Sequence, residues 1–189
     1  MKLKATIFTL LLLGLISLKS YSQNSTVSHK ISVDIPEVAL LGLVAETQTE
    51  ITLNAVAPDE AGNAVDFTSR SNQRIWINYS SIHSEVAQKR KVIAVVQGEI
   101  PKGVILKVEA SEYSGIGKGK FGKSAGAVTL SNQPTDVIVD IGSCYTGKGV
   151  NNGHYLTYNL QQNASGANYA QLSQSQTAVN VLYTLTDYN

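Results

Sequence analysis

Arg74-Ile-Trp-Ile-Asn-Tyr79, near the middle of the chain, is the stretch that most clearly indicates a fold class. It is rich in β-branched and aromatic residues, which are favoured in strands. Two further strand-like segments follow at Lys91–Gln97 and Val104–Ala110. The residues between them, Gly98-Glu-Ile-Pro-Lys-Gly103, predict a hairpin connection. The centre of the chain therefore predicts antiparallel strands.

The C-terminal half repeats this pattern. A second hairpin is predicted from Gly126–Ser131 to Asp136–Ile141, around Asn132-Gln-Pro134. Two later strands are expected at His154–Leu160 and Thr177–Thr186. The polar segment between these two strands has room for one short helix near Tyr169–Leu172.

The N-terminal half contains three more candidate strands. Val27–Ile35 alternates, so that one face carries Val27, Ile31, Val33 and Ile35, with His29 among them, and the other face is polar. After Pro36, the apolar run Val38–Val44 has the length of a buried strand, although a short helix is an alternative. Thr49–Ala57 alternates again, whereas Ser81–Arg90 predicts a helical turn or loop.

These segments amount to about eight to ten short strands with turn residues at regular intervals and without a long amphipathic helix. The pattern predicts an all-β fold, a single immunoglobulin-like β-sandwich over residues 23–189, because two half-buried sheets can cover each other. A barrel is the alternative. The chain shows neither an internal repeat nor a linker that would divide this domain.

The first 22 residues have the features of a cleavable export signal. Lys2 and Lys4 precede an apolar stretch from Ile7 to Leu18, and Ser20-Tyr21-Ser22 has the small residues of a cleavage site. The stretch is shorter than the roughly 20 residues that a membrane span needs. We therefore expect the protein to be exported to the periplasm, the cell surface or the medium.

The charge of the predicted mature chain argues against some partners. The full chain has 15 Lys and Arg against 14 Asp and Glu. Loss of Lys2, Lys4 and Lys19 with the signal leaves 12 against 14, a net charge of −2. A nucleic-acid or anionic-membrane partner would require a clustered basic excess, so neither is expected. The mature chain also contains no second apolar stretch long enough to span a membrane.

Residues with catalytic or metal-binding chemistry do not form a recognisable set. The only cysteine, Cys144, lies ten residues before His154, but no family signature surrounds it and no third group orients the pair. We expect Cys144 to be a small apolar residue that caps a strand, with an intermolecular disulfide as the alternative. The three histidines are far apart and lack metal-ligand spacing. The sequence therefore predicts a non-enzymatic protein without metal or cofactor.

A glycine-lysine segment, Gly117-Lys-Gly-Lys-Phe-Gly-Lys-Ser124, matches the phosphate-binding loop pattern letter for letter. That chemistry requires a helix directly after the loop, so that helix-terminal N–H groups meet the phosphates. Here Ala125–Leu130 predicts a strand instead, and nucleotide binding is not expected. The loop is retained as a candidate site for an anionic surface or sugar through Lys118, Lys120 and Lys123.

Aromatic residues offer a second class of ligand contact. Tyrosines such as Tyr145 and Tyr155 could stack on sugar rings if they lined one face. His154, beside the glycine-rich Gly142–Gly153, is a further candidate ligand residue. In strands, however, aromatic side chains are more often packing partners. A carbohydrate- or matrix-binding module is therefore kept as the alternative function.

Two features at the chain ends resemble exported bacterial surface subunits of the pilin or fimbrial-adhesin type. One is the alternating segment Val27–Ile35 directly after the signal, and the other is the closing strand Thr177–Asn189 with its penultimate tyrosine. The resemblance implies that Val27–Ile35 completes the sandwich of a neighbouring copy or another surface subunit by β-strand addition. It also implies that a chaperone reads the last strand. The chain lacks that family's paired cysteines and has Gln176 and Thr177 where the family has glycine.

The sequence thus predicts an exported surface or fimbrial subunit with a structural or adhesive role. Two placements of Val27–Ile35 remain open. The segment either pairs within its own sheet, as most first strands do and as we favour, or is added to a neighbour.

Overall fold

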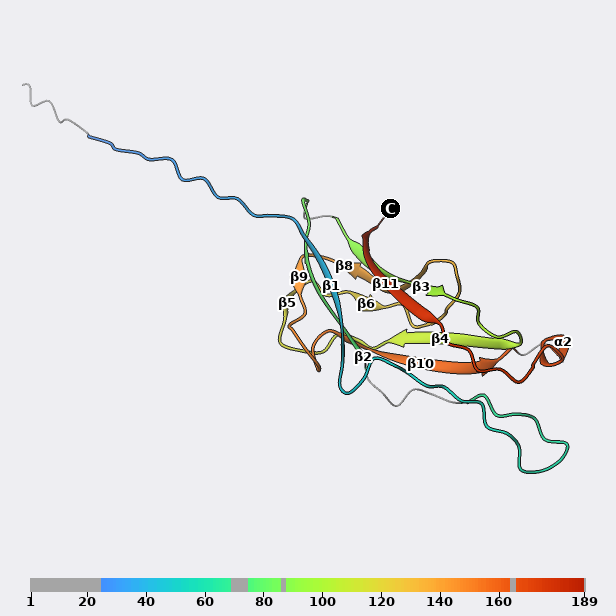
Figure 1. Ribbon diagram of the computed structural model, residues 1–189. Coiled ribbons are helices and arrows are strands. Elements are labelled where there is room, and N and C mark those ends of the chain that lie inside the picture. The colour runs from blue at the N-terminus through green and yellow to red at the C-terminus, as the bar shows by residue number, and fades with distance from the viewer. Residues whose placement is uncertain (1–24, 69–74, 86–87, 164–165, 189) are drawn as a thin grey trace, which may run out of the picture. The chain divides into compact units, whose positions relative to one another are not determined.

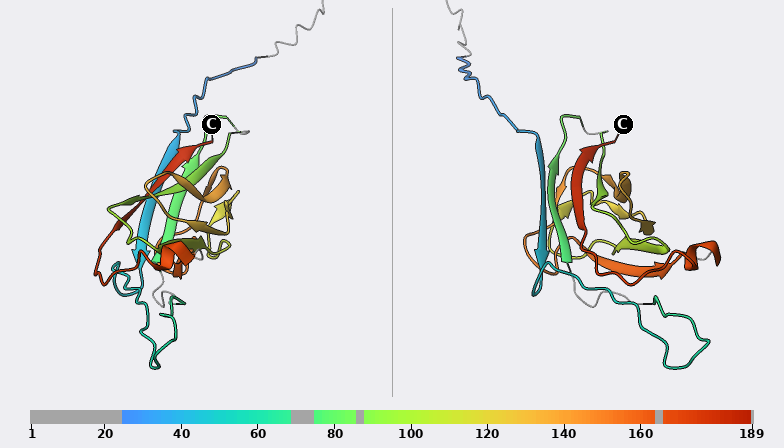
Figure 2. Two further views of the ribbon diagram at one scale, coloured as in Figure 1. Left: turned by 90° about the vertical axis from the view of Figure 1, so that its right-hand side faces the viewer. Right: turned by 45° about the vertical axis from the view of Figure 1, so that its right-hand side comes forward.

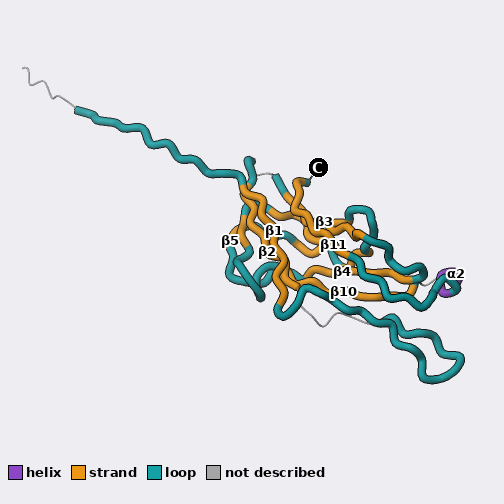
Figure 3. Tube along the Cα trace, viewed as in Figure 1, coloured by secondary structure: helices purple, strands orange, loops and turns teal. Residues whose placement is uncertain are grey.

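The structure is a computed structural model that describes residues 25–68, 75–85, 88–163 and 166–188. The predicted signal peptide lies outside these residues. The chain divides into two units, residues 1–35 and Pro36–Asn189. In the described part of the second unit, nearly everything is strand or loop, apart from the single helical turn α2 (Gly166–Tyr169) (Figure 1; Figure 3). None of the described helical residues forms a helix long and apolar enough to cross a membrane.

The described strands form two antiparallel sheets, which confirms the all-β prediction. The large sheet contains β1 (Val38–Ala45), β2 (Ile75–Ile82), β4 (Val104–Ala110), β5 (Lys118–Gly119), β7 (Ala127–Thr129), β9 (Cys144–Tyr145) and β10 (His154–Gln162). The small sheet contains β3 (Arg90–Gln97), β6 (Lys123–Ser124), β8 (Thr135–Ile141) and β11 (Asn180–Asp187).

Strand β2 is the centre of the large sheet. One side of it pairs along its full length with β1, from Val38 opposite Ile82 to Ala45 opposite Ile75 (Figure 2). Its other side pairs with β10 near its start and with β9 near its end. The rest of the order is β5-β9-β2-β10-β4-β7, whereas the small sheet runs β11-β3-β8-β6.

Both sheets contribute side chains to one hydrophobic core. Ile77, Val108 and Leu156 of the large sheet and Val92 and Ile138 of the small sheet are almost fully buried. In β3 the buried residues alternate with partly exposed ones, as expected for a strand with one face on the core. A hydrogen bond of 2.7 Å joins the hydroxyls of two buried tyrosines, Tyr158 of β10 and Tyr183 of β11.

The two predicted hairpins are wrong, although their strands exist. Strand β3 belongs to the small sheet and β4 to the large sheet, so residues 98–103 cross between sheets. The same holds for β7 and β8, which the second predicted hairpin would have paired. Alternation reports which side chains face the core, but strands on either side of the core satisfy it equally well.

Two N-terminal predictions also need correction. The run Val38–Val44 forms strand β1, but this strand is half-exposed rather than buried. Residues 49–57 form no strand and contribute only an isolated bridge between Val56 and Asp66. An alternating segment becomes a strand only where a neighbour supplies its hydrogen bonds. In the predicted loop 81–90, β2 extends to Ile82, and residues 86 and 87 lie outside the described part.

Candidate functional site

The strand predicted over residues 27–35 is not formed in this structure. None of the described residues 25–37 belongs to a strand, and residues 25–37 are all exposed. Val27 is 91% exposed and Ile31, Val33 and Ile35 are between 72% and 81% exposed. Single exposed apolar residues are common on proteins, whereas four at alternate positions of one short segment form a candidate contact surface.

The link between this segment and β1 is short and contains a proline. Only Pro36 and Glu37 separate Ile35 from β1. A two-residue hairpin requires positive φ at its first central position, whereas proline is locked near −65°. The described non-glycine residues with positive φ are Asp140 and Asn151, so neither Pro36 nor Glu37 adopts that conformation.

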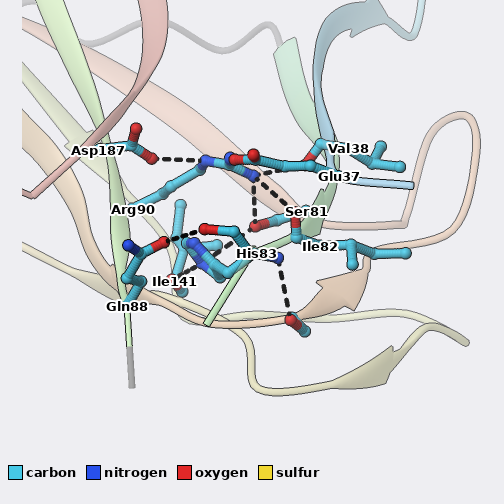
Figure 4. A network of polar contacts seen from close by, with 11 residues as sticks. Glu37, Val38, Ser81, Ile82, His83, Gln88, Arg90, Ile141 and Asp187 are labelled. Atoms are coloured by element: carbon cyan, nitrogen blue, oxygen red, sulfur yellow. Dashed lines mark hydrogen bonds and ion pairs between the residues drawn. The ribbon is translucent and has the colours of Figure 1, made fainter. Parts of the chain in front are cut away.

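The start of β1 is anchored by a buried arginine, Arg90 of β3, whose side chain is 4% exposed (Figure 4). Its Nε donates to Asp187 Oδ1 of β11 at 2.9 Å. Its Nη1 donates to the carbonyl oxygen of Val38 and, at 3.3 Å, to the hydroxyl of Ser81. Its Nη2 donates to a carboxylate oxygen of Glu37. One guanidinium thus joins β1, β2, β3 and β11.

The charged groups that meet at Arg90 differ in their exposure to solvent. The arginine is buried, whereas the carboxylates of Glu37 and Asp187 remain 51% and 66% exposed. The planar fork of arginine can direct several donors at once, which suits it to such a junction. Glu37 and Val38 are therefore held at a fixed position directly after Pro36.

The three predicted ligand lysines lie on β5, on β6 and in the link between these two strands. Lys118 lies on β5 directly opposite Tyr145 of β9. Lys123 lies on β6 opposite Val139, in the small sheet. Lys120 and Lys123 both act electrostatically on Asp140, which forms an ion pair of 2.6 Å with Lys89. The hydrogen bond from Lys89 lowers the pKa of Asp140.

Strands, rather than a helix, occupy and follow the glycine-lysine segment. Residues 117–124 contain the two short strands β5 and β6. Strand β7 follows this segment, as predicted, and the described residues contain no helix there.

His154 and Tyr155 are adjacent in the chain but differ in solvent exposure. His154 is fully buried, and its side chain is not presented to solvent. Tyr155 is 36% exposed and packs edge-to-face against Trp76, with ring centroids 5.5 Å apart. Of the six predicted ligand residues, only Lys118 and Tyr145 are directly paired.

His154 belongs to a buried hydrogen-bond chain. Its Nδ1 donates to the carbonyl oxygen of Ser111 at 2.7 Å, which places the ring proton on Nδ1. Its Nε2, 2.9 Å from the hydroxyl of Tyr79, then accepts the proton of that hydroxyl. The Tyr79 oxygen in turn accepts the N–H of Gly122 at 3.0 Å. The chain therefore requires a neutral imidazole, and burial lowers the pKa of His154.

We expect this histidine to make the protein less stable in mild acid. The folded-state pKa of His154 lies below the ordinary value of 6.5, so the unfolded state binds more protons below that pH. The stabilisation is complete above pH 6.5 and falls as the pH drops, by up to about 1.4 kcal/mol per pH unit. Urea unfolding at pH 7.5 and pH 5.5 would measure the loss. His154→Gln should abolish most of it, whereas His29→Gln, in the exposed segment, should retain it; equal losses in both variants would contradict the assignment.

Cys144 is buried on β9 and belongs to the hydrophobic core. Burial raises the pKa of its thiol to about 11, so the thiolate is scarce at neutral pH. Both ring nitrogens of His154 are already hydrogen-bonded to Ser111 and Tyr79. The arrangement therefore offers Cys144 no free imidazole at position 154 and favours a packing role.

Arg90 and the exposed side chains of β1 are features that the sequence interpretation missed. An arginine at position 90 continues the inward-facing series of β3, Val92, Ala94 and Val96, and this was the available signal. Leu40 of β1 is 65% exposed and borders a shallow groove of about 470 Å³ with Val44, Asn78 and Tyr145. On the opposite face of β1, Leu43 is 45% exposed.

Within the described part of the chain, no three His, Cys, Asp or Glu side chains are grouped as metal ligands. Comparison of the chain with protein-family models, with curated proteins and with solved structures found no match. The candidate site is therefore defined by geometry alone: an exposed alternating segment, residues 27–35, joined through Pro36 to a rigidly held strand.

Proposed function

We propose that the protein is an exported, non-enzymatic subunit of a surface or fimbrial structure, with a structural or adhesive role. In this proposal, residues 1–22 are a signal peptide and residues 23–189 form one immunoglobulin-like β-sandwich. The subunits assemble by β-strand addition, in which residues 27–35, the donor segment, join a sheet of another subunit. The exposed row of Val27, Ile31, Val33 and Ile35 carries this proposal.

The free-energy gains and costs expected for strand addition favour reversible assembly. Burying each of the four Val and Ile side chains contributes about 1.5–3 kcal/mol, and each new ladder hydrogen bond contributes about 0.5–1.5 kcal/mol. Ordering the backbone costs about 1–2 kcal/mol for each residue of the segment. Gains and costs are of similar size, so we expect the degree of assembly to depend on protein concentration.

Light scattering of the predicted mature chain, Gln23–Asn189, across a range of concentrations tests the proposal. The mass should rise with concentration and should be the same with and without reductant, because Cys144 is buried. The double variant Ile31→Asp/Val33→Asp should remain monomeric, because it places charges on the face to be buried.

The donor segment supplies a matched control on its opposite face. Ser28→Asp/Ser32→Asp adds the same charge to the same segment but leaves the apolar row intact, so assembly should persist. A mature chain that stays monomeric at every concentration, or two double variants that behave alike, would refute strand addition through residues 27–35.

A further inference from the structure

Two long strands among the described residues are hydrogen-bonded to a neighbouring strand on one side only. Strand β1 pairs with β2, and β11 pairs with β3. Each has eight residues, whereas the other strands at sheet ends, β5, β6 and β7, have two or three. Of the strands that the structure describes, only β1 and β11 offer a free edge long enough to pair with most of a segment the length of residues 27–35.

The composition of these two edges differs. Strand β1 is Val-Ala-Leu-Leu-Gly-Leu-Val-Ala, without a charged or polar side chain. Strand β11 carries Asn180, Thr184, Thr186 and Asp187. Proteins normally protect an exposed edge with charges, proline or a bulge, and an unprotected apolar edge pairs with another chain. Of the two long edges, β1 is the unprotected one.

On the side of β1 that faces the core, one large apolar side chain is still partly exposed. Leu43 lies directly opposite Ile77, so both side chains point toward the core side of the sheet. Ile77 is 0% exposed, whereas Leu43 is 45% exposed. A further strand beside β1 would bring side chains next to Leu43 and cover it. The packing is therefore incomplete at this edge.

From these observations we infer that the free edge of β1 is the acceptor for residues 27–35 of a second copy of this chain. This inference rests on the proposed function and specifies its partner surface. The apolar row Val27, Ile31, Val33 and Ile35 lies on the core side, where it covers Leu43, and the polar row faces outward. A tight turn that would bring the chain's own segment onto this edge is disfavoured by Pro36, because proline cannot adopt the positive φ of such a turn.

Donor and acceptor are different surfaces of each copy, so the contact is heterologous. One copy gives its segment to the β1 edge of the next, and its own β1 edge receives the segment of a third. Contacts of this kind generate rings if the rotation closes and open filaments if it does not.

Disulfide trapping between two mixed proteins tests the acceptor edge. One protein carries Ser32→Cys in the donor segment. The other carries either Gly42→Cys on β1 or Thr184→Cys on β11, each outward-facing near the middle of its strand. A Cβ at Gly42 meets nothing within 4 Å, so this change leaves the fold intact. Buried Cys144 stays in place, and protein with Cys144 alone is the background control.

Because donor and acceptor cysteines are on different molecules of different tagged mass, only an intermolecular contact gives the mixed product. We expect the product with Gly42→Cys to exceed that with Thr184→Cys at least tenfold under air oxidation. Equal or greater trapping at Thr184→Cys would overturn the β1 assignment and leave strand addition standing. Trapping at neither position, while light scattering shows assembly, would also overturn it. Absence of both trapping and assembly would refute the proposed function as well.

A second variant pair tests the same edge without cysteines. Leu43→Lys places a charge where the donor row is to pack, whereas Thr184→Lys places one on the outer face of β11. Since Leu43 is already half-exposed, the fold should tolerate the change, which a thermal melt would verify. We expect Leu43→Lys to raise the concentration needed for assembly more than tenfold and Thr184→Lys to leave it unchanged. The reverse pattern would contradict the inference.

Discussion

Replacement of Arg90 by methionine is expected to lower the free energy of unfolding by about 3 kcal/mol. The arginine supplies donors to the carbonyl oxygen of Val38, to the carbonyl oxygen of Ile82 at 3.4 Å and to the hydroxyl of Ser81. Ser81 is fully buried, so water cannot replace the lost donor there. The carboxylates of Glu37 and Asp187 are exposed and regain water, which limits their share of the loss.

Lys91→Met is the matched control for this experiment. Lys91 is the next residue of β3 and forms a partly exposed ion pair of 3.0 Å with Asp136. Such a pair contributes up to about 1 kcal/mol. Urea unfolding at pH 7 should therefore separate the two variants clearly. Arg90→Lys should recover less than half of the loss, because an ammonium cannot reproduce the fork. Equal losses for Arg90→Met and Lys91→Met would show that Arg90 is not a junction.

The second large effect is expected at Gly153, the residue before β10. Its φ is +88°, and a Cβ built on it would overlap the carbonyl oxygen of Ile77 in β2. Its backbone also exchanges two hydrogen bonds with Ser114, of 2.7 and 2.9 Å. An alanine here must adopt an unfavourable φ, at about 1–2 kcal/mol, and must also displace the central strand. We expect Gly153→Ala to cost more than about 3 kcal/mol in total.

A substitution at Gly149 separates the cost of the unfavourable φ from the cost of the overlap with β2. The φ of Gly149 is +92°, but a Cβ there meets nothing within 4 Å. Gly149→Ala should therefore show the conformational cost alone, about 1 kcal/mol. The difference between the two midpoints of urea unfolding measures the overlap with β2. If Gly149→Ala were as destabilising as Gly153→Ala, the close approach to Ile77 would have no energetic weight.

Local patterns in the sequence predict the strands well and their partners poorly. The segments at β2, β3, β4, β8, β10 and β11 were all recognisable, because β-branched residues alternate with polar ones or form short apolar runs. The crossing of residues 98–103 between sheets was not, because hairpin and crossover connections of similar length share the same turn residues. Pairing depends on which distant strand is adjacent, and no local pattern encodes this.

The candidate site shows the same division. The alternating face of residues 27–35 is visible in the sequence, but whether such a segment forms a strand depends on the whole fold, and the described residues 25–37 form none. The apolar run at 38–44 suggested a buried strand, yet Leu40 and Leu43 are exposed because no described strand lies beyond β1. The sequence shows that His154 lies beside a glycine-rich loop, which suggested a ligand residue. It does not show the hydrogen bonds of His154 to Ser111 and Tyr79, which give this side chain a buried structural role.

The position of Arg90 has a mechanical consequence for any assembly joined through residues 27–35. Tension on a donor segment would reach its own subunit at Pro36 and pass next to Glu37 and Val38. Arg90 connects these two residues to β2, β3 and β11, so the load would be shared by both sheets rather than peel β1 away from β2 alone. A strand sheared along its whole ladder resists force better than one opened bond by bond, and the arginine is placed where peeling would begin.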